Sequence, residues 1–282
     1  MDLENIIPKG GPTIFEVKKY IQKYNKEIIV IKCGGSVLLE SLLFDQFIED
    51  ILVVNKLGLN TIIVHGGGKN IKKKLDENKI ASKFIDGLRV TDEKTISVVE
   101  KALNELNLEI VKKLNEKSCM AFSINSKNNI IKVNKVSSEL GYVGNPSSVE
   151  NKYLNELISK KKLPIIVPMG KDKNNKIYNI NADIAAGAVA KSLNSRRLLL
   201  MTDVEGVLDK NNKLVSELYS EIAEKMIEDG IIKGGMIPKI NTCLDAVHNG
   251  VTGVAIIDGR KPHSILFELF SDKGAGTLIR KW

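Results

Sequence analysis

Two glycine turns that each stand next to a lysine are the residues of this chain whose types and spacing could do chemistry. Lys32 is followed by Gly34 and Gly35, and three further glycines, at positions 66–68, are followed by Lys69. Glycine lets the backbone approach a ligand closely, and the N–H groups of such a turn can point at an anion. The pattern therefore predicts a site for a phosphorylated ligand.

These turns do not match the commonest nucleotide-binding motifs. Lys32 precedes its glycines, whereas the lysine of a Walker A motif follows them, and the sequence contains no G-x-G-x-x-G. The absence of the second motif argues against a dinucleotide cofactor. Two such turns on one predicted sheet edge indicate phosphate binding more strongly than either turn alone.

Each glycine turn follows a short apolar segment that has the character of a buried strand. The four β-branched residues at 28–31 show no polar alternation, which indicates a strand covered on both faces. A helix predicted over 42–57 and ended by Gly58 links it to a second strand at 62–64, and a further helix is predicted over 69–78. This alternation predicts an α/β fold with right-handed βαβ units. We expect an open, mostly parallel sheet with helices on both faces, two lobes and an appended N-terminal helix.

The remaining segments continue the same alternation. Helices are predicted over 92–117, with Thr91 as the N-cap, and over 150–162, 182–193, 216–229, 234–248 and 264–270. Strands are predicted at 163–168, 198–202, 254–257 and 277–279, with one or two hairpins in 121–145. The predicted divisions are an N-terminal oligomerisation helix in 1–26, a first lobe over 27–192 and a second over 193–282. The amphipathic helix after Pro12 either folds back onto its own core or docks on another subunit.

Composition and charge exclude several classes of protein. The chain is 43% apolar and 27% charged, as in ordinary globular proteins, and no apolar run approaches the ~18 residues of a membrane span. No signal or transit peptide is recognisable, so we expect the protein to work where it is made. The net charge of +8 comes mostly from lysines without interleaved aromatic residues, which argues against nucleic acid binding. Three distant cysteines without metal-ligand spacing predict free thiols.

The ends of the predicted strands mark where a ligand would bind. In open α/β sheets, ligands lie beyond the carboxyl ends of the strands. The predicted strands end at Lys32 with its glycines, at the 66–68 turn, at Gly170, at 202–203 and at 258–259. We expect these positions to converge on one edge of the sheet.

Six motifs resemble, in order, those of the amino-acid kinase family, from about residue 12 to the C-terminus. They are Lys32-x-Gly34-Gly35-Ser36, His65-Gly66-Gly67-Gly68, Gly87-Leu88-Arg89-Val90-Thr91, Asn179-x-Asn181-Ala182-Asp183, Thr202-Asp203-Val204-x-Gly206-Val207 and Gly234-Gly235-Met236-Ile237-Pro238-Lys239. The resemblance implies MgATP-dependent phosphorylation of the γ-carboxylate of N-acetyl-L-glutamate to N-acetyl-L-glutamyl 5-phosphate, a step of arginine biosynthesis. The six motifs jointly are specific, although no single one would be.

The same resemblance implies a role for each motif residue. Lys32 and Lys239 would stabilise the charge on the transferring phosphoryl group, and Asp183 would hold both lysines in place. The other implied contacts are those of Gly34 and Gly35 with phosphate, of Gly67, Gly68, Arg89 and Asn179 with the substrate, and of Thr202, Asp203 and Gly206 with ATP. The nucleotide would carry the Mg²⁺ ion, so no metal site is expected in the protein. Asp203 has the alternative role of capping its own turn.

A carboxylate acceptor would remove the need for a general base. Such a nucleophile is already ionised at neutral pH. This agrees with a chain that has only three histidines and no obvious catalytic one. We interpret His65 as a structural residue that supports its glycine turn, and Lys69 as a surface residue at a helix start.

The resemblance extends to an arginine-inhibited, hexameric branch of the family. Tyr20, His263, Glu268 and Gly276 would contact arginine as an allosteric inhibitor, and the N-terminal helices would interlace three dimers into a ring. Ordinary packing is the alternative for each of these four residues. Some relatives of this branch bind a PII signalling protein, which is therefore a further candidate partner. No nucleic acid and no membrane are expected as partners.

Departures from the family pattern and rival hypotheses remain. Cys33 stands where an aromatic residue or leucine is common, and 123–129 lacks the usual glycine-rich turn. The rivals are a family kinase for aspartate, carbamate or uridylate, and a non-catalytic arginine-sensing hexamer. Arg89 with Asn179 favours an acidic amino acid derivative, and the clustered lysines argue against the sensor. The A+T-rich residue usage fits the plastid stroma, for an organelle-encoded protein, and the bacterial cytoplasm equally.

Overall fold

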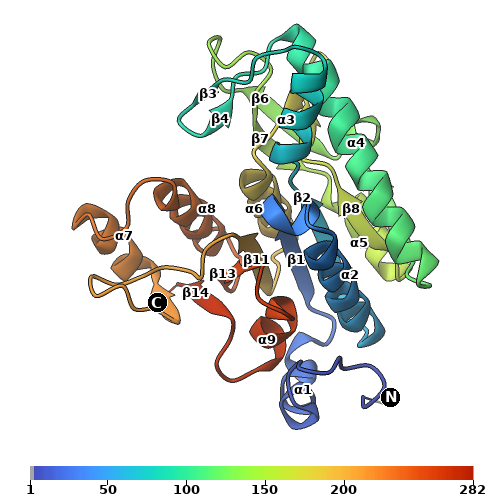
Figure 1. Cartoon of the computed structure of the whole chain (residues 1–282), viewed down its shortest axis with the longest axis vertical. Helices are drawn as coiled ribbons and strands as arrows, with labels where there is room; N and C mark the ends of the chain where they lie inside the picture. Colours follow the sequence, from blue (N-terminus) through green and yellow to red (C-terminus); the bar gives the residue numbers. More distant parts are fainter. Residues whose placement is uncertain (1–2, 282) are drawn as a thin grey trace.

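The central element of the fold is an eight-stranded sheet, seen in the computed structural model, which describes residues 3–281 (Figure 1). The strand order is β12-β14-β13-β11-β1-β2-β8-β5. The strands are Glu217–Tyr219 (β12), Gly276–Arg280 (β14), Val254–Asp258 (β13), Arg197–Thr202 (β11), Ile28–Cys33 (β1), Asn60–His65 (β2), Leu163–Ile166 (β8) and Ala121–Ile124 (β5). Neighbours run parallel except β13 and β14. The prediction of an open, mostly parallel sheet is confirmed.

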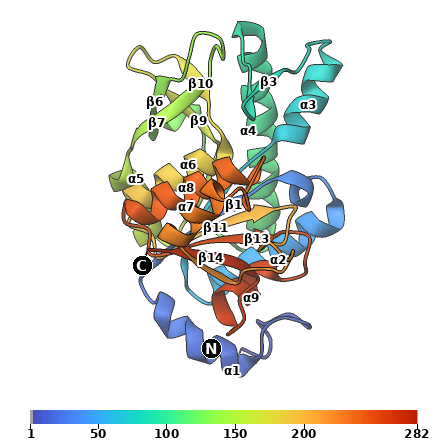
Figure 2. The same ribbon diagram turned by 90° about the vertical axis from the view of Figure 1, so that its left-hand side faces the viewer.

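Helices cover both faces of this sheet, as predicted. One layer consists of α5 (Asn151–Ser159), α6 (Ala182–Ser192), α7 (Ser220–Glu228) and α8 (Met236–His248), and the other of α2 (Ser41–Lys56), α4 (Glu93–Glu116) and α9 (Ser264–Phe270). Side chains alternate along a strand, so Val30 of β1 lies in the core of the first layer and Ile29 and Ile31 in that of the second. Figure 2 shows α6 and α8 on one side of the strands and α2 and α9 on the other.

Strand β1 stands at the point where the strand order reverses. It pairs with β2 on one side and with β11 on the other, and Lys32 is in register with Val64 and Leu200. At such a topological switch point, the connections after the neighbouring strands diverge and leave a crevice. The carboxyl ends of β1, β2 and β11 meet there, as predicted. A short 3₁₀ helix, η2 (Gly35–Leu38), follows β1 directly.

Two smaller sheets stand beyond this edge, at the top of Figure 1. The first has the order β10-β9-β6-β7, with strands Ile177–Asn179, Met169–Lys171, Ile131–Lys135 and Gly144–Val149. The second is the hairpin of β3 (Phe84–Ile85) and β4 (Leu88–Arg89), which follows α3 (Gly68–Glu77).

The prediction of hairpins in 121–145 is correct for β6 and β7 but wrong for β5. Strand β5 pairs in parallel with β8 at the edge of the main sheet, and the turn η3 (Ser126–Asn128) separates it from β6. Ala121 and Ile124 are buried. The short alternating pattern therefore belongs to an edge strand, whose partner lies about 40 residues away and could not be recognised locally.

The appended N-terminal helix consists of α1 (Ile14–Ile21) and the turn η1 (Gln22–Tyr24). Thr13 begins it with a capping box: its hydroxyl accepts the Glu16 N–H at 3.2 Å, and its own N–H donates to the Glu16 carboxylate at 3.0 Å. Val17 is buried, and the rings of Tyr24 and Phe270 meet edge-to-face at 6.2 Å. The helix thus folds back onto its own chain next to α9, while Phe15 is 79% exposed.

Several helix starts differ from the prediction, and two of them have a clear physical reason. Asp92, and not Thr91, caps α4, because its carboxylate accepts the Thr95 N–H at 2.7 Å. Thr91 is fully buried, and its hydroxyl donates to the Arg89 carbonyl. Helix α7 begins at Ser220 because β12 occupies the residues just before it.

The cysteines Cys33, Cys119 and Cys243 are free and buried. Burial raises the pKa of each thiol, so all three stay protonated in the folded protein. Between residues 3 and 281, no helix combines the length and the apolar character that crossing a membrane requires.

Candidate active site

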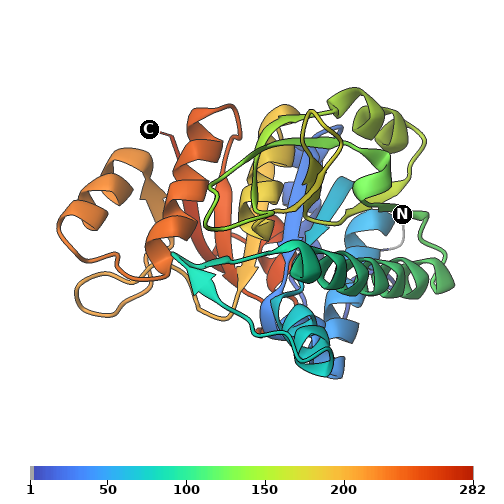
Figure 3. The same cartoon turned by 90° about the horizontal axis from the view of Figure 1, so that it is seen from above.

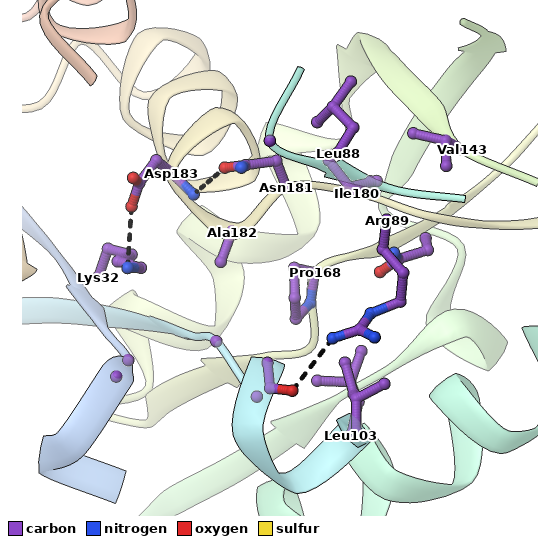
Figure 4. Close-up of a pocket in the computed structure, with 18 of the residues that line it drawn as sticks. Lys32, Leu88, Arg89, Leu103, Val143, Pro168, Ile180, Asn181, Ala182 and Asp183 are labelled. Carbon is purple, nitrogen blue, oxygen red and sulfur yellow. Dashed lines mark hydrogen bonds and ion pairs between the residues drawn. The ribbon is translucent and has the colours of Figure 1, made fainter. Parts of the chain in front are cut away.

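Three charged side chains from three distant segments meet beside the end of β1. The ammonium of Lys32 lies 2.9 Å from one carboxylate oxygen of Asp183, as Figure 4 shows, and that of Lys239 lies 2.6 Å from the other. All three side chains are largely buried, with 12 to 15% of each exposed. One carboxylate therefore bridges two ammonium groups, and this cluster carries a net charge of +1.

The start of α6 positions Asp183. Asn181 caps this helix: its side-chain oxygen accepts the N–H groups of Asp183 and Ile184 at 2.9 and 3.3 Å. A carboxylate in the first turn is favoured by the helix dipole. Burial by itself would raise the pKa of Asp183, but the two ammonium groups outweigh it and lower the pKa to about 2. Asp183 is therefore ionised across the physiological range.

A cavity of about 210 Å³ opens next to this cluster. It is lined by eight of the residues singled out in the sequence: Lys32, Gly34, Gly35, Gly67, Gly68, Arg89, Asn179 and Asp183. Lys239 lies against it through its ion pair with Asp183. The structure thus brings the predicted catalytic, phosphate-binding and substrate-binding residues into one place.

The two glycine turns lie against each other at the floor of this cavity. The Gly66 N–H donates to the Cys33 carbonyl at 2.6 Å, and a Cβ on Gly66 would stand 3.5 Å from the Cα of Gly34. Gly35 has φ +65°, and a Cβ there would meet the Asp203 carboxylate at 2.8 Å. Glycine at position 35 is therefore needed both for its backbone conformation and for space. Lys69, at the start of α3, is exposed, as predicted.

Arg89 closes the cavity from the β3–β4 hairpin, which is the cyan segment reaching out beside α3 in Figure 3. Its guanidinium donates to the Gly68 carbonyl at 3.1 Å and to the Ser82 hydroxyl, and it stacks 4.6 Å from the centroid of the Phe84 ring. Asn179, the last residue of β10, lines the same cavity. With five donors on its planar group, Arg89 can bind a carboxylate in addition to these two partners.

The three residues assigned to ATP lie at the end of β11 and just after it. The Asp203 carboxylate accepts hydrogen bonds from the Ser36 hydroxyl at 2.7 Å and from the Ser36 N–H at 3.4 Å, so it holds the first glycine turn. Thr202 ends β11 in register with Asp258. Gly206 has φ +144°, and a Cβ there would stand 2.5 Å from the Thr277 hydroxyl. Asp203 thus holds the first glycine turn, and Thr202, Asp203 and Gly206 all lie outside the cavity lining.

The four residues assigned to arginine binding are only partly brought together. Tyr20 donates its hydroxyl hydrogen to Asp272, and Glu268 accepts the Ala275 N–H at 2.9 Å, so both contact the connection between α9 and β14. Gly276 pairs in the sheet, where a Cβ would stand 1.9 Å from the Ile256 carbonyl oxygen. His263 points away to α2, and its Nδ1–H donates to the Asp50 carboxylate at 2.7 Å.

The buried His263–Asp50 pair should make stability depend on pH. The hydrogen bond with Asp50 raises the pKa of His263, and burial raises the pKa of Asp50 to about 6. The folded state then keeps protons that the unfolded state has lost, so this contribution is complete below pH ~4 and is lost as pH rises through the raised values. We expect the free energy of unfolding to fall by on the order of 1 kcal/mol between pH 5 and 8 because of this pair.

Urea unfolding at both pH values checks this expectation. The double variant Asp50→Asn/His263→Gln should lose that part of the pH dependence, whereas His248→Gln, an exposed histidine of α8, should keep it. Equal pH dependence in the double variant and the wild-type protein would refute the assignment.

Two residues of the site were not assigned a role from the sequence. Asn181 stands directly before a small-residue helix, which is an N-cap signal that could have identified it. Asn107 of α4 is fully buried, and its amide nitrogen lies 3.0 Å from Nε2 of His65. The sequence shows only a polar residue on the apolar face of a helix, with no sign of its partner.

The open α/β sheet, with glycine turns and two lysines at its switch point, defines a phosphate-binding α/β protein. The model of the Amino acid kinase family matches residues 27–258, and the chain belongs to this family. It is 57% identical to the acetylglutamate kinase of Pelagibacter ubique over 99% of this chain and 98% of that one, and 42% identical to the acetylglutamate kinase of Nitrobacter winogradskyi over 94% of both.

A solved structure shares the fold at low sequence identity. The N-acetylglutamate synthase from Neisseria gonorrhoeae, complexed with coenzyme A and N-acetyl-glutamate, superposes with a TM-score of 0.87 at 22% identity. The match covers 95% of this chain and 62% of the synthase, so this chain spans less than two thirds of that protein.

Proposed function

We propose that the protein phosphorylates the γ-carboxylate of N-acetyl-L-glutamate with ATP, giving N-acetyl-L-glutamyl 5-phosphate in arginine biosynthesis. The observation that carries the proposal is the Lys32–Asp183–Lys239 cluster at the mouth of a cavity lined by glycine turns and Arg89. The relatives named acetylglutamate kinase, at 57% and 42% identity over nearly the whole chain, support the choice of substrate.

The charges suit phosphoryl transfer to a carboxylate. Such a transfer depends on positioning and on neutralising the charge that spreads over the phosphoryl oxygens. Lys32 and Lys239 would face that charge, while Asp183 keeps the two ammonium groups oriented. The acceptor carboxylate is ionised at neutral pH, so no proton has to be removed from it. His65, neutral because burial lowers its pKa to about 4, is not required as a base.

The substrate would lie between Arg89 and Asn179, with its reacting carboxylate near Gly67 and Gly68. Arg89 would pair with the substrate's other carboxylate, which favours an acidic amino acid derivative over carbamate. ATP would lie over the second lobe near 202–207, with its phosphates toward Gly34 and Gly35. We accordingly assign the acyl-amino-acid site to 27–192 and the ATP site, with regulation, to 193–282.

The magnesium ion would be held by the nucleotide. The carboxylate at the site, Asp183, already has both oxygens against ammonium groups, and residues 3–281 contain no cluster of three or more metal-binding side chains. When bound, the ion would neutralise phosphate charge and help to align the phosphates. The protein's own lysines and backbone N–H groups would supply the remaining neutralisation and alignment of the phosphates.

Arginine inhibition and hexamer formation remain part of the proposal. Tyr20, Glu268 and the connection between α9 and β14 form one contact region under α1, and Glu268 is a buried carboxylate with Lys23 and Arg197 nearby. The exposed Phe15 on α1 is available for another subunit in a ring of interlaced dimers. A PII signalling protein is a further candidate partner. The plastid stroma or the bacterial cytoplasm remains the predicted location.

Acyl-phosphate formation, trapped as the hydroxamate, tests the function. We expect hydroxamate from ATP with N-acetyl-L-glutamate, little ADP release when aspartate, carbamate or uridylate is the acceptor, and less hydroxamate when free arginine is added. In Arg89→Ala, KM for N-acetyl-L-glutamate should rise about 100-fold, as for a lost charge-assisted contact, while KM for ATP changes little. Product that is indifferent to arginine would leave the kinase and remove the regulatory site. No product with any acceptor, but binding of arginine, would identify the non-catalytic sensor.

A further inference from the structure

A buried hydrogen-bonded pair connects helix α4 to the second glycine turn. His65, the last residue of β2, and Asn107 of α4 are both fully buried. Nδ1 of His65 lies 2.9 Å from the Gly66 carbonyl oxygen, and Nε2 lies 3.0 Å from the amide nitrogen of Asn107. The same amide nitrogen lies 2.9 Å from the Ile165 carbonyl oxygen of β8.

These contacts decide where the protons are. The Ile165 carbonyl only accepts, so the Asn107 group beside it must be the NH₂ group and not the amide oxygen. Its second hydrogen then points at Nε2 of His65, which must be unprotonated to accept it. A neutral imidazole therefore carries its proton on Nδ1 and donates it to the Gly66 carbonyl. The amide oxygen of Asn107 has no hydrogen-bond partner among the described residues, whereas its NH₂ group makes two hydrogen bonds. The NH₂ group is therefore the part of this side chain that the site uses.

This chain of hydrogen bonds fixes the orientation of a peptide unit that faces the cavity. The Gly66–Gly67 peptide bond is trans, so its C=O and the N–H of Gly67 point in opposite directions. His65 holds the C=O toward the core, which directs the Gly67 N–H toward the cavity that Gly66, Gly67 and Gly68 line. On its other side Gly66 is held by the hydrogen bond from its N–H to Cys33. The peptide is thus constrained from α4 and from β1 at once.

We propose that Asn107 is a positioning residue for phosphoryl transfer, acting through the Nδ1–H tautomer of His65 to aim the Gly67 N–H at the reacting oxygen atoms. The proposal rests on the proposed function, since it assigns that N–H to the phosphoryl group or the acceptor carboxylate. Neither His65 nor Asn107 touches the substrate. Their effect is on the direction of one backbone donor.

Two substitutions separate this role from simple packing. Asn107→Leu removes both hydrogen bonds with a side chain of the same branching, and Asn107→Asp replaces the NH₂ donor by an acceptor, so that His65 would place its proton on Nε2. A missing oxyanion-type donor lowers kcat by about 10²–10³-fold, and a misdirected one should lower it by about tenfold or more. KM for ATP should change little, because the nucleotide site lies on other segments.

Asn115→Leu is the matched control on the same helix. The Asn115 side chain makes two hydrogen bonds with the backbone of Ala121, at 2.7 and 3.1 Å, away from the cavity. Asn115 is exposed, whereas Asn107 is fully buried, so its loss should destabilise the protein less than Asn107→Leu and should not lower the kcat of the folded enzyme. An equal loss of kcat per folded molecule in the Asn107 and Asn115 variants would overturn the proposal.

Nitrogen-15 spectra of the labelled histidines give the readout that is independent of activity. The chain has three histidines, so His65 can be assigned by difference with a His65→Asn variant. We expect a neutral ring protonated on Nδ1 in the wild type and a ring protonated on Nε2 in Asn107→Asp. A wild-type ring protonated on Nε2 would overturn the inference at any level of activity. Wild-type enzyme that makes no acyl phosphate would overturn the proposed function instead, and the ring spectrum would still decide the tautomer.

Discussion

Replacing Lys239 or Lys32 by alanine is expected to lower kcat by about 10²–10³-fold each while ATP binding largely survives. Both ammonium groups lie within 3 Å of Asp183 at the mouth of the cavity, in a largely buried setting. Their positive charge stabilises most strongly the phosphoryl charge that develops during transfer. The two substitutions should therefore change kcat more than the binding constant of either substrate. Initial rates from the hydroxamate assay, together with calorimetric titration of ATP, measure the two effects separately.

Lys191→Ala is the matched control for both lysines. Lys191 of α6 pairs with Asp245 of α8 at 2.5 Å. This pair joins the same two helices as the Lys239–Asp183 pair, but on a more exposed face away from the cavity. Its loss should leave kcat unchanged. Unchanged turnover in both Lys32→Ala and Lys239→Ala would sink the proposed mechanism.

Asp183→Asn is expected to lower both kcat and stability. Without the carboxylate, two ammonium groups face each other in a largely buried place, and breaking such a cluster by removing one partner destabilises by about 3 kcal/mol. The lowered pKa of Asp183, about 2, gives the sign of the pH dependence. Its stabilisation is complete above the unfolded value near pH ~4 and is lost as pH falls toward 2. Wild type and variant should therefore differ most at neutral pH and converge in acid.

Urea unfolding at pH 7 and pH 3, with kcat at pH 7, measures these effects. Asp245→Asn removes the corresponding carboxylate of the exposed Lys191 pair and should cost less than about 1 kcal/mol, with no change in kcat. If Asp183→Asn and Asp245→Asn behave alike at pH 7, then Asp183 does not organise the two lysines.

Features set by local sequence were predictable in this fold. The β-branched segment before Lys32 forms the central strand β1, and Gly58 ends α2 with φ +81°, because both depend on near neighbours in the chain. The capping of α4 was misassigned by one residue, since Thr91 and Asp92 are both good caps and only the tertiary fold buries the first. The pairing of strand β5 was mispredicted for a similar reason, because its partner β8 is distant in sequence.

In the candidate site, too, features set by local sequence were predictable and those set by tertiary packing were not. Eight residues that line the cavity were found from motifs, and the contact of Asp183 with both lysines was implied by the family resemblance, but the other contacts were not predicted. Nothing in the sequence connects Lys32 with Lys239 except the family pattern, whereas the structure joins them through one carboxylate. Asp203 was left between two roles, and its bond to Ser36 is a contact across 167 positions that no spacing rule reports. Asn107 and His65, which are 42 positions apart, form a pair that only the packing of α4 on β2 creates.

The buried thiols give the protein a built-in reporter of opening. Alkylating reagents attack the thiolate, and Cys33 and Cys243 are fully buried with pKa values raised by burial. Cys33 lies directly beside Lys32 in β1, and Cys243 lies one turn beyond Lys239 in α8. The rate at which a maleimide labels each thiol therefore measures how often the strand or the helix that carries a candidate catalytic lysine becomes accessible to solvent.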